Sequence, residues 1–131
     1  LALVNSGNVK DGLVDLFRLD YENDNDIDVK RIIAWGYLVN CKPNDAERVY
    51  DWIVNSDRAI DSDWLNCGYV KFILSKTGEA VRCFQRFVEQ NEATDQRELL
   101  KRELANDWKI LSKNGVKDYE AHLIVYIVMT K

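Results

Sequence analysis

The sequence has little proline, histidine or cysteine, and it lacks the motifs of most enzyme and metal-binding classes. Its 131 residues include one proline, one histidine and three cysteines. Cys41, Cys67 and Cys83 show no C-x-x-C spacing, so neither a disulfide framework nor a zinc site is expected, and we interpret them as small buried residues. The acidic stretch from Asp24 to Asp28 lacks the glycine and glutamate that a calcium loop needs. With His122 as the sole imidazole and no nucleophile or phosphate-loop motif, we expect no enzymatic activity, no catalytic residue, no metal and no cofactor.

The sequence also lacks a large excess of charge of one sign and a long apolar run. The net charge is −4, from 18 basic and 22 acidic residues, which disfavours binding to a phosphate backbone, so no nucleic acid is expected as a partner. The longest apolar run, at 121–129, contains a histidine and is too short to span a bilayer. The chain begins at Leu1 without an initiator methionine, so we expect it to be a piece of a longer protein. We expect the protein to be located in the cytoplasm.

What the sequence does contain is a repeat. An acidic residue followed by a small one occurs at 11–12, 45–46 and 79–80, which are intervals of 34 residues. Apolar residues follow each small residue after four and seven positions, the spacing of one helical stripe. These apolar residues are Leu16 and Leu19, Tyr50 and Ile53, and Phe84 and Phe87. A fourth copy lies at 120–121, with Val125 and Val128 as its apolar residues. Its interval from the third copy is 41 residues, seven more than 34. Seven residues are about two helical turns, so a helix can be longer there while its apolar face keeps the same orientation.

A second helix is predicted before each stripe. Trp64 and Gly68 share one face of this helix in the clearest copy, and Gly36 holds the matching place in the copy before it. Glycine inside a helix costs about 1 kcal/mol relative to alanine, so it is expected where another helix approaches closely. We expect Ala46 and Ala80 to be the facing small residues. Each unit is therefore interpreted as helix, short turn, helix.

At this point the sequence resembles the tetratricopeptide repeat family. Trp64, Gly68, Ala80 and Phe84 stand at the spacing of that family, whereas Lys71 stands where tyrosine is usual. The resemblance implies an all-α fold, a right-handed superhelical stack of antiparallel helix pairs. It implies a single domain over 1–131, with repeats at about 1–24 (partial), 27–56, 62–91 and 95–131.

The expected helices follow this register. They span about 9–20, 27–41, 44–56, 62–75, 78–91, 95–113 and 117–130. By propensity alone the β-branched stretch 123–128 favours a strand, but the repeat register predicts a helix there.

The resemblance implies a non-enzymatic protein–protein interaction module that binds a peptide or protein segment in a concave groove. In the family, the outward face of the first helix of each pair lines this groove. Projecting that face selects Ile33, Tyr37, Asn40, Leu65, Tyr69, Phe72, Ile110 and Lys113 as partner-binding residues. Some members of the family hold the terminal carboxylate of a peptide with lysine and asparagine side chains on successive first helices. Ile33 and Tyr37 occupy the first of these positions here, and neither can donate to a carboxylate as lysine does. Capture of a C-terminal carboxylate is therefore not expected.

Two alternatives remain open. The domain could be a regulatory or sensor part of a larger enzyme or transcription regulator. It also has features of a pentatricopeptide-like binder of single-stranded RNA, in the short spacing from Gly36 to Ala46, although the negative charge disfavours this. The apolar end at Leu1–Val4 predicts possible self-association of the array.

Overall fold

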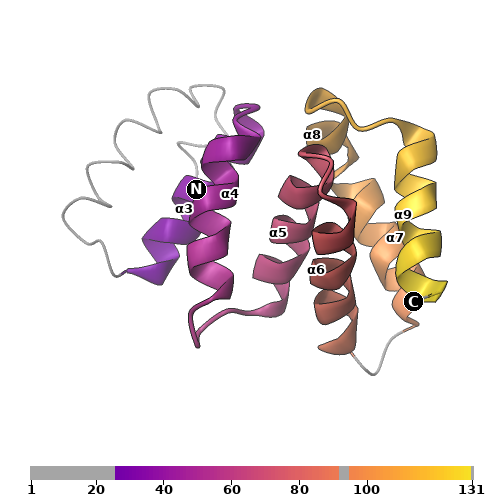
Figure 1. Cartoon of the computed structure of the whole chain (residues 1–131), viewed down its shortest axis with the longest axis horizontal. Coiled ribbons are helices and arrows are strands. Elements are labelled where there is room, and N and C mark those ends of the chain that lie inside the picture. Colours follow the sequence, from indigo (N-terminus) through magenta and orange to yellow (C-terminus); the bar gives the residue numbers. More distant parts are fainter. Residues whose placement is uncertain (1–25, 92–94, 131) are drawn as a thin grey trace.

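Helices dominate the described part of the chain. The computed structural model describes residues 26–91 and 95–130, and these ranges contain seven helices (Figure 1). They are α3 (Ile27–Val39), α4 (Pro43–Val54), α5 (Asp61–Ile73), α6 (Thr77–Glu89), α7 (Gln96–Asn106), α8 (Trp108–Lys113) and α9 (Asp118–Thr130). The all-α class is confirmed, and the stretch 123–128 is helical as predicted. The expected helix at 9–20, the partial repeat at 1–24 and the apolar end at 1–4 lie outside the described residues.

Successive helices pack against each other, most extensively α3 with α4 and α5 with α6. The 34-residue interval recurs in these two pairs, since α5 and α6 begin 34 positions after α3 and α4 respectively. The turn inside each pair repeats as well, because Cys41 and Ser75 have left-handed φ values of 57° and 63°. The residue after each of them donates its N–H to the carbonyl five positions earlier at 2.8 Å, which closes the helix end.

The third unit departs from the prediction. The sequence predicts one helix over 95–113, but the structure has two, because α7 ends at Asn106 and α8 begins at Trp108. Asp107 lies between them with φ −99° and ψ 9°. Its carboxylate accepts a hydrogen bond from the Tyr69 hydroxyl at 2.6 Å. The single-helix prediction is wrong because helical periodicity does not register a side-chain contact made with α5.

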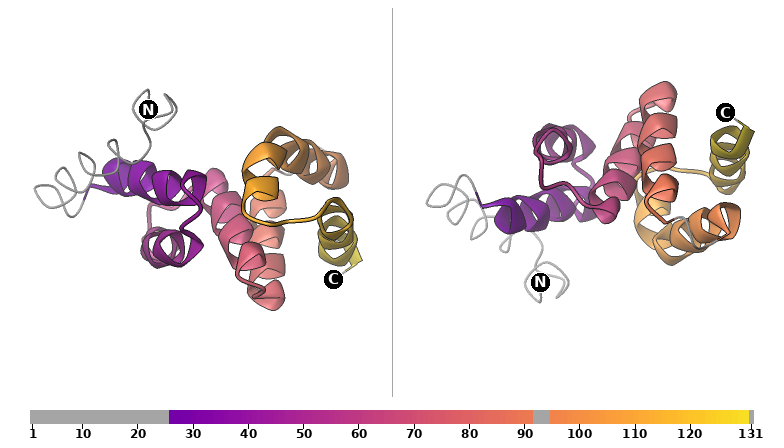
Figure 2. Two further views of the ribbon diagram at one scale, coloured as in Figure 1. Left: turned by 90° about the horizontal axis from the view of Figure 1, so that it is seen from above. Right: turned by 90° about the horizontal axis from the view of Figure 1, so that it is seen from below.

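The end of α8 lies against the end of α3. Asn114 Nδ2 donates to the Leu38 carbonyl at 3.1 Å across 76 positions, and the Cys41 thiol donates to the Lys113 carbonyl at 3.6 Å. The third unit is thereby joined to the first, and Figure 2 shows the units following one another along the molecule. One open pocket is lined by residues of α3, α5 and α7.

The predicted inner stripes form the core. Tyr50, Phe84 and Phe87 are buried, as are Val125 and Val128. Cysteines 67 and 83 are buried as expected, whereas the interpretation of cysteine 41 as buried is wrong, because it sits exposed in the first turn. Within 26–91 and 95–130, every helix is too short or too polar to cross a membrane.

Candidate functional site

The structure buries half of the residues predicted to line a groove. Ile33, Tyr37, Leu65 and Tyr69 are 2%, 7%, 4% and 1% exposed, and all four belong to the hydrophobic core. The Tyr69 hydroxyl donates to the Glu103 carbonyl at 3.2 Å, so α7 covers the face of α5 that the register leaves open. The binding role of these four residues stays a prediction, and their side chains offer a partner almost no surface.

The other four predicted residues are more accessible but are not gathered in one cavity. Asn40, Phe72 and Ile110 are half-buried, and Lys113 is exposed. The Lys113 ammonium donates to the Val39 carbonyl at 3.4 Å, where α8 meets α3. Of the eight predicted residues, Leu65 alone lines the pocket that lies between α3, α5 and α7.

This pocket, called the α3–α5–α7 pocket below, has a volume of about 370 Å³. Its walls come from the first helix of each unit, and Tyr50 of α4 also contributes. The lining residues are Arg31, Ile32, Trp35, Tyr50, Ser62, Asp63, Leu65, Asn66, Glu103 and Asp107. It therefore combines an apolar and aromatic wall with several carboxylates, in a volume suited to a small group or a single side chain.

A buried ion pair holds one wall of the pocket. Asp63 is 2% exposed and accepts hydrogen bonds from Arg31 Nε at 3.0 Å and Arg31 Nη2 at 2.9 Å. Asp63 also accepts from the Ile60 N–H at 2.9 Å, which caps the start of α5. The Arg31 guanidinium further donates to Asp28 at 3.0 Å and to the Arg58 carbonyl at 3.0 Å. Hydrogen bonding to Asp63 raises the pKa of Arg31, so this arginine is fully charged and already committed to internal partners.

Two further carboxylates on the opposite wall lack such a cation. Glu103 and Asp107 form no ion pair with any residue in the described ranges. Burial raises the pKa of Asp107, and the hydrogen bond from Tyr69 offsets part of this effect. The pocket therefore holds two carboxylates for which the described residues provide no cationic partner.

Tyr50 of α4 lines the pocket, and its hydroxyl is buried. Tyr50 is 1% exposed, and its hydroxyl makes no hydrogen bond with normal geometry to a described residue. Burial raises the pKa of Tyr50 well above its usual value, and the negative charges of Asp63 and Asp107 act in the same direction, whereas a side-chain hydrogen bond with Asn66 acts against them.

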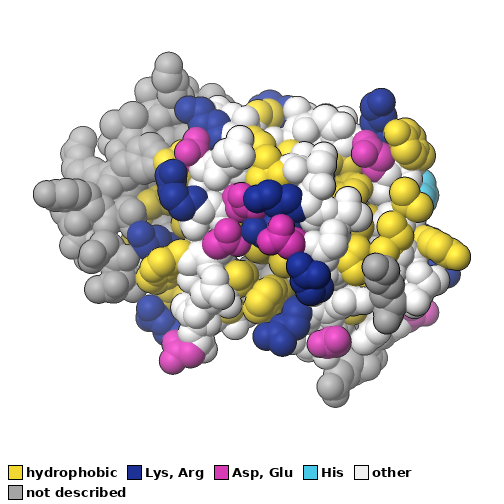
Figure 3. Space-filling view, in the orientation of Figure 1, with side chains coloured by type: hydrophobic (Ala, Val, Ile, Leu, Met, Phe, Trp, Pro, Cys, Tyr) yellow, Lys and Arg dark blue, Asp and Glu magenta, His cyan; other side chains and the backbone are white. Residues whose placement is uncertain are grey.

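A second hollow, of about 440 Å³, lies between α4, α5 and α6, and its charges are matched. The Lys71 ammonium is 2.9 Å from Glu47, 2.9 Å from Asp51 and 3.5 Å from Glu79. Figure 3 shows acidic and basic side chains gathered at the centre of this face. Burial alone lowers the pKa of Lys71, but hydrogen bonds to Glu47 and Asp51 outweigh it and raise the pKa overall. The charge of Lys71 is thus balanced by carboxylates of the protein itself.

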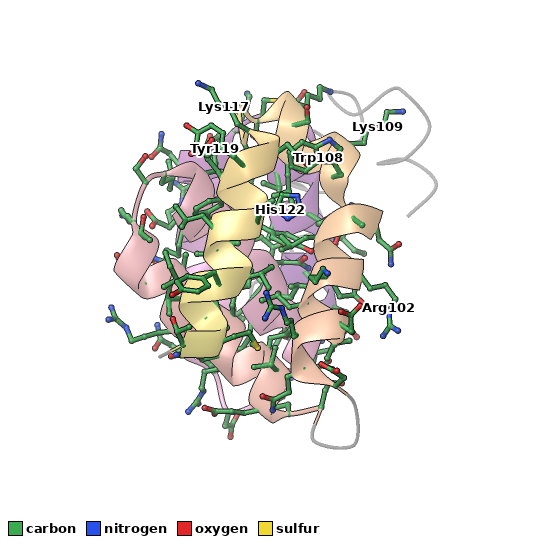
Figure 4. All side chains as sticks on the ribbon, turned by 90° about the vertical axis from the view of Figure 1, so that its right-hand side faces the viewer. Arg102, Trp108, Lys109, Lys117, Tyr119 and His122 are labelled. Carbon is green, nitrogen blue, oxygen red and sulfur yellow. The ribbon has the colours of Figure 1, made fainter. Side chains whose placement is uncertain are left out.

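A third hollow, of about 360 Å³, lies between α7, α8 and α9. Figure 4 shows His122 of α9 and Trp108 of α8 over the space between α9 and α7. His122 is exposed and pairs with Asp118 at 3.5 Å. No three metal-ligating side chains in ranges 26–91 and 95–130 are grouped so as to hold an ion.

Comparison with known proteins yields no relative. No protein family, no curated protein and no solved structure matches the chain significantly. What stands is an all-helical domain whose helices pack in pairs.

Sequence reasoning missed most of the α3–α5–α7 pocket. Arg31 and Asp63 lie 32 positions apart, and nothing in their local sequence marks them as partners. Asp63 occupies the first turn of a helix, where an aspartate is ordinary. Asp107 carried one usable signal, since aspartate is unfavourable inside a helix and marks a possible end.

Proposed function

We propose that this domain is a protein-interaction module of tetratricopeptide-like architecture, and that a segment of a partner protein docks in the α3–α5–α7 pocket. The observation that carries this proposal is the open pocket itself, which combines an apolar wall of Ile32 and Trp35 with carboxylates that have no cationic partner among the described residues. Interaction sites typically pair an aromatic or apolar anchor region with a few polar groups that orient the partner. The resemblance to tetratricopeptide repeats supports binding at this place, because the first helix of each unit provides the walls.

The chemistry of the pocket favours binding over catalysis or RNA recognition. Among the described residues no histidine, cysteine or lysine lines the pocket, so Ser62 has no imidazole beside it to act as a base, and His122 lines a different hollow. Three carboxylates against the single cation Arg31 repel a phosphate backbone. A neutral or cationic segment is therefore the better occupant.

A steric block tests the proposal. Ser62 is exposed at the edge of the pocket, so Ser62→Trp fills the entrance without removing a core contact. Ser112→Trp, on the exposed surface of α8 and outside the pocket, is the matched control. Wild type and both variants are used as bait in a lysate of the source cell, and captured proteins are quantified by mass spectrometry after circular dichroism has verified the folds.

A protein captured equally by wild type and Ser112→Trp, and several-fold less by Ser62→Trp, is the expected result. Equal capture by Ser62→Trp would exclude the pocket as the docking place. Failure of wild type to capture any protein above a bead control would overturn the interaction function.

A further inference from the structure

The two buried cysteines are neighbours where α5 packs against α6. Cys67 directly precedes Gly68 on α5. Cys83 directly precedes Phe84 on α6, and a Cβ on Gly68 would lie 2.7 Å from the ring of this phenylalanine. The helices therefore approach closely beside the cysteines, and the two thiol groups form a hydrogen bond with each other. Two residues that are 16 positions apart in the sequence thus bring their sulfur atoms together.

Both cysteines also line the hollow of about 440 Å³ between α4, α5 and α6. Cys67 is 1% exposed and Cys83 is 7% exposed, so Cys83 is the more accessible of the two. A hollow of this size admits a small reagent to sulfur atoms that a bulky reagent does not reach. The third cysteine, Cys41, is exposed and donates to the Lys113 carbonyl, so it provides a comparison thiol within the same chain.

The charges around the hollow distinguish the two thiols. The hydrogen bond with Cys67 lowers the pKa of Cys83, burial acts against it, and the positive charge of the Lys71 ammonium lowers the pKa again. The carboxylates of Asp51 and Glu79 oppose this effect, and the net result is a lowered pKa. The same hydrogen bond, together with burial, raises the pKa of Cys67. Cys83 is therefore the thiol that more readily becomes a thiolate, which is the nucleophilic form of cysteine.

We propose that Cys67 and Cys83 form an oxidation site that hydrogen peroxide converts to a disulfide linking α5 to α6, independently of the proposed binding function. In the first step the Cys83 sulfur forms a bond to one peroxide oxygen and the O–O bond breaks. The departing hydroxide takes up the proton that the thiol has lost, which gives water and leaves a sulfenic acid on Cys83.

The second step closes the bridge between the two helices. The Cys67 sulfur bonds to the Cys83 sulfur and gives up its proton, and the S–O bond breaks to release a second water. Two thiols are thereby oxidised to one disulfide, while one molecule of hydrogen peroxide is reduced to two molecules of water.

Peptide mapping of the oxidised chain tests this site. The reduced 131-residue chain is treated with one equivalent of hydrogen peroxide, unfolded in the presence of N-ethylmaleimide and digested with trypsin. Cleavage after lysine and arginine places Cys67 in the peptide 59–71 and Cys83 in the peptide 83–86. A disulfide between them therefore joins two peptides that mass spectrometry identifies directly. The same chain oxidised in concentrated urea is the control for the role of the fold.

The expected product of the folded chain is the disulfide between peptides 59–71 and 83–86, with Cys41 labelled by N-ethylmaleimide. The unfolded control should give all three pairings of the cysteines. Oxidation of Cys41 while Cys67 and Cys83 stay free would overturn the proposal, and so would failure of the pair to react. Exclusive pairing of Cys67 with Cys83 in urea would also overturn it, because the fold would then play no part.

Single substitutions in a Cys41→Ser background identify the attacking thiol. In Cys67→Ser the sulfenic acid on Cys83 has no second thiol to react with, so dimedone should label Cys83. In Cys83→Ser, dimedone should label Cys67 several-fold more slowly. Equal labelling in the two variants would overturn the assignment of Cys83 to the first step. Circular dichroism verifies the folds, and peptide mapping of the unsubstituted chain remains the test if a serine at either buried position unfolds the protein.

Discussion

A ring of Phe84 fills the place that a side chain on Gly68 would need. A Cβ built on Gly68 would lie 2.7 Å from Cε1 of Phe84, whose side chain is completely buried. The sequence predicts a close approach at Gly68 but places the small side chain of Ala80 opposite it. The structure shows instead that the glycine makes room for an aromatic ring, which lets α5 and α6 pack closely.

Gly68→Ala should therefore destabilise the fold by about 1–3 kcal/mol, and Gly68→Leu by more, because the buried ring has to move. Gly78→Ala on α6 is the matched control, since a Cβ there meets only Arg82 Nη1 at 3.9 Å. Alanine gains helix propensity at both positions, so the control should be neutral or slightly stabilised. Urea denaturation of both variants measures the difference, and equal stabilities would refute the packing described for α5 and α6.

The Arg31–Asp63 pair should contribute more to the stability of the fold than the Arg31–Asp28 pair. Asp63→Asn is expected to cost about 2–3 kcal/mol, because it weakens buried, charge-assisted hydrogen bonds and leaves the arginine short of its partner. Asp28 has 84% of its side chain exposed, so Asp28→Asn should cost less than about 1 kcal/mol. Thermal unfolding compares them, and a larger loss for Asp28→Asn would contradict the arrangement.

Two tyrosines should respond differently to loss of the hydroxyl. Tyr69→Phe removes the 2.6 Å hydrogen bond to Asp107 and is expected to cost about 1.5–3 kcal/mol. Tyr50→Phe removes a buried hydroxyl that makes no hydrogen bond of normal geometry to a described residue, so it should be neutral or slightly stabilising. Chemical denaturation at neutral pH tests the pair, and a marked loss for Tyr50→Phe would show that its hydroxyl is bonded after all.

The Glu47 carboxylate should contribute to acid sensitivity. Burial acts to raise the pKa of Glu47, but hydrogen bonds from Lys76 and Lys71 outweigh this and lower it overall. A lowered folded-state pKa stabilises the fold above the ordinary value near 4.5, and this contribution is lost as pH falls through the folded-state pKa. The stability difference between wild type and Glu47→Gln should therefore shrink on acidification below about pH 5. Melting temperatures against pH test this, with Glu98→Gln on the exposed surface of α7 as the matched control.

The three thiols should react in two classes. Cys41 is exposed, whereas Cys67 and Cys83 are buried, and hydrogen bonding to Cys83 raises the pKa of Cys67 further. Ellman's reagent should titrate one thiol rapidly in the native protein and all three after unfolding. Rapid reaction of two or more native thiols would contradict the burial of the α5–α6 pair.

Local patterns predicted the helices well, and they failed at tertiary contacts. The bounds of α3, α4, α5, α6 and α9 lie within two residues of the predicted ranges, because amphipathic stripes and turn positions repeat along the chain. The single helix over 95–113 failed at Asp107, where a hydrogen bond from Tyr69 accompanies the break. The groove projection stays a prediction, but it did not anticipate that α7 covers Tyr69, because the repeat register alone does not say which face a later helix will bury.

The sequence by itself determined the helical class and the 34-residue alternation of two helices, because hydrophobic period and turn signals are local properties. Only the tertiary structure decided which charges are matched. Arg31 meets Asp63 across 32 positions, and Lys71 gathers Glu47, Asp51 and Glu79, whereas Glu103 and Asp107 are left facing an open pocket. Such pairings depend on how whole helices are placed in space, since the interaction between two charges follows their distance and burial and not their separation along the chain.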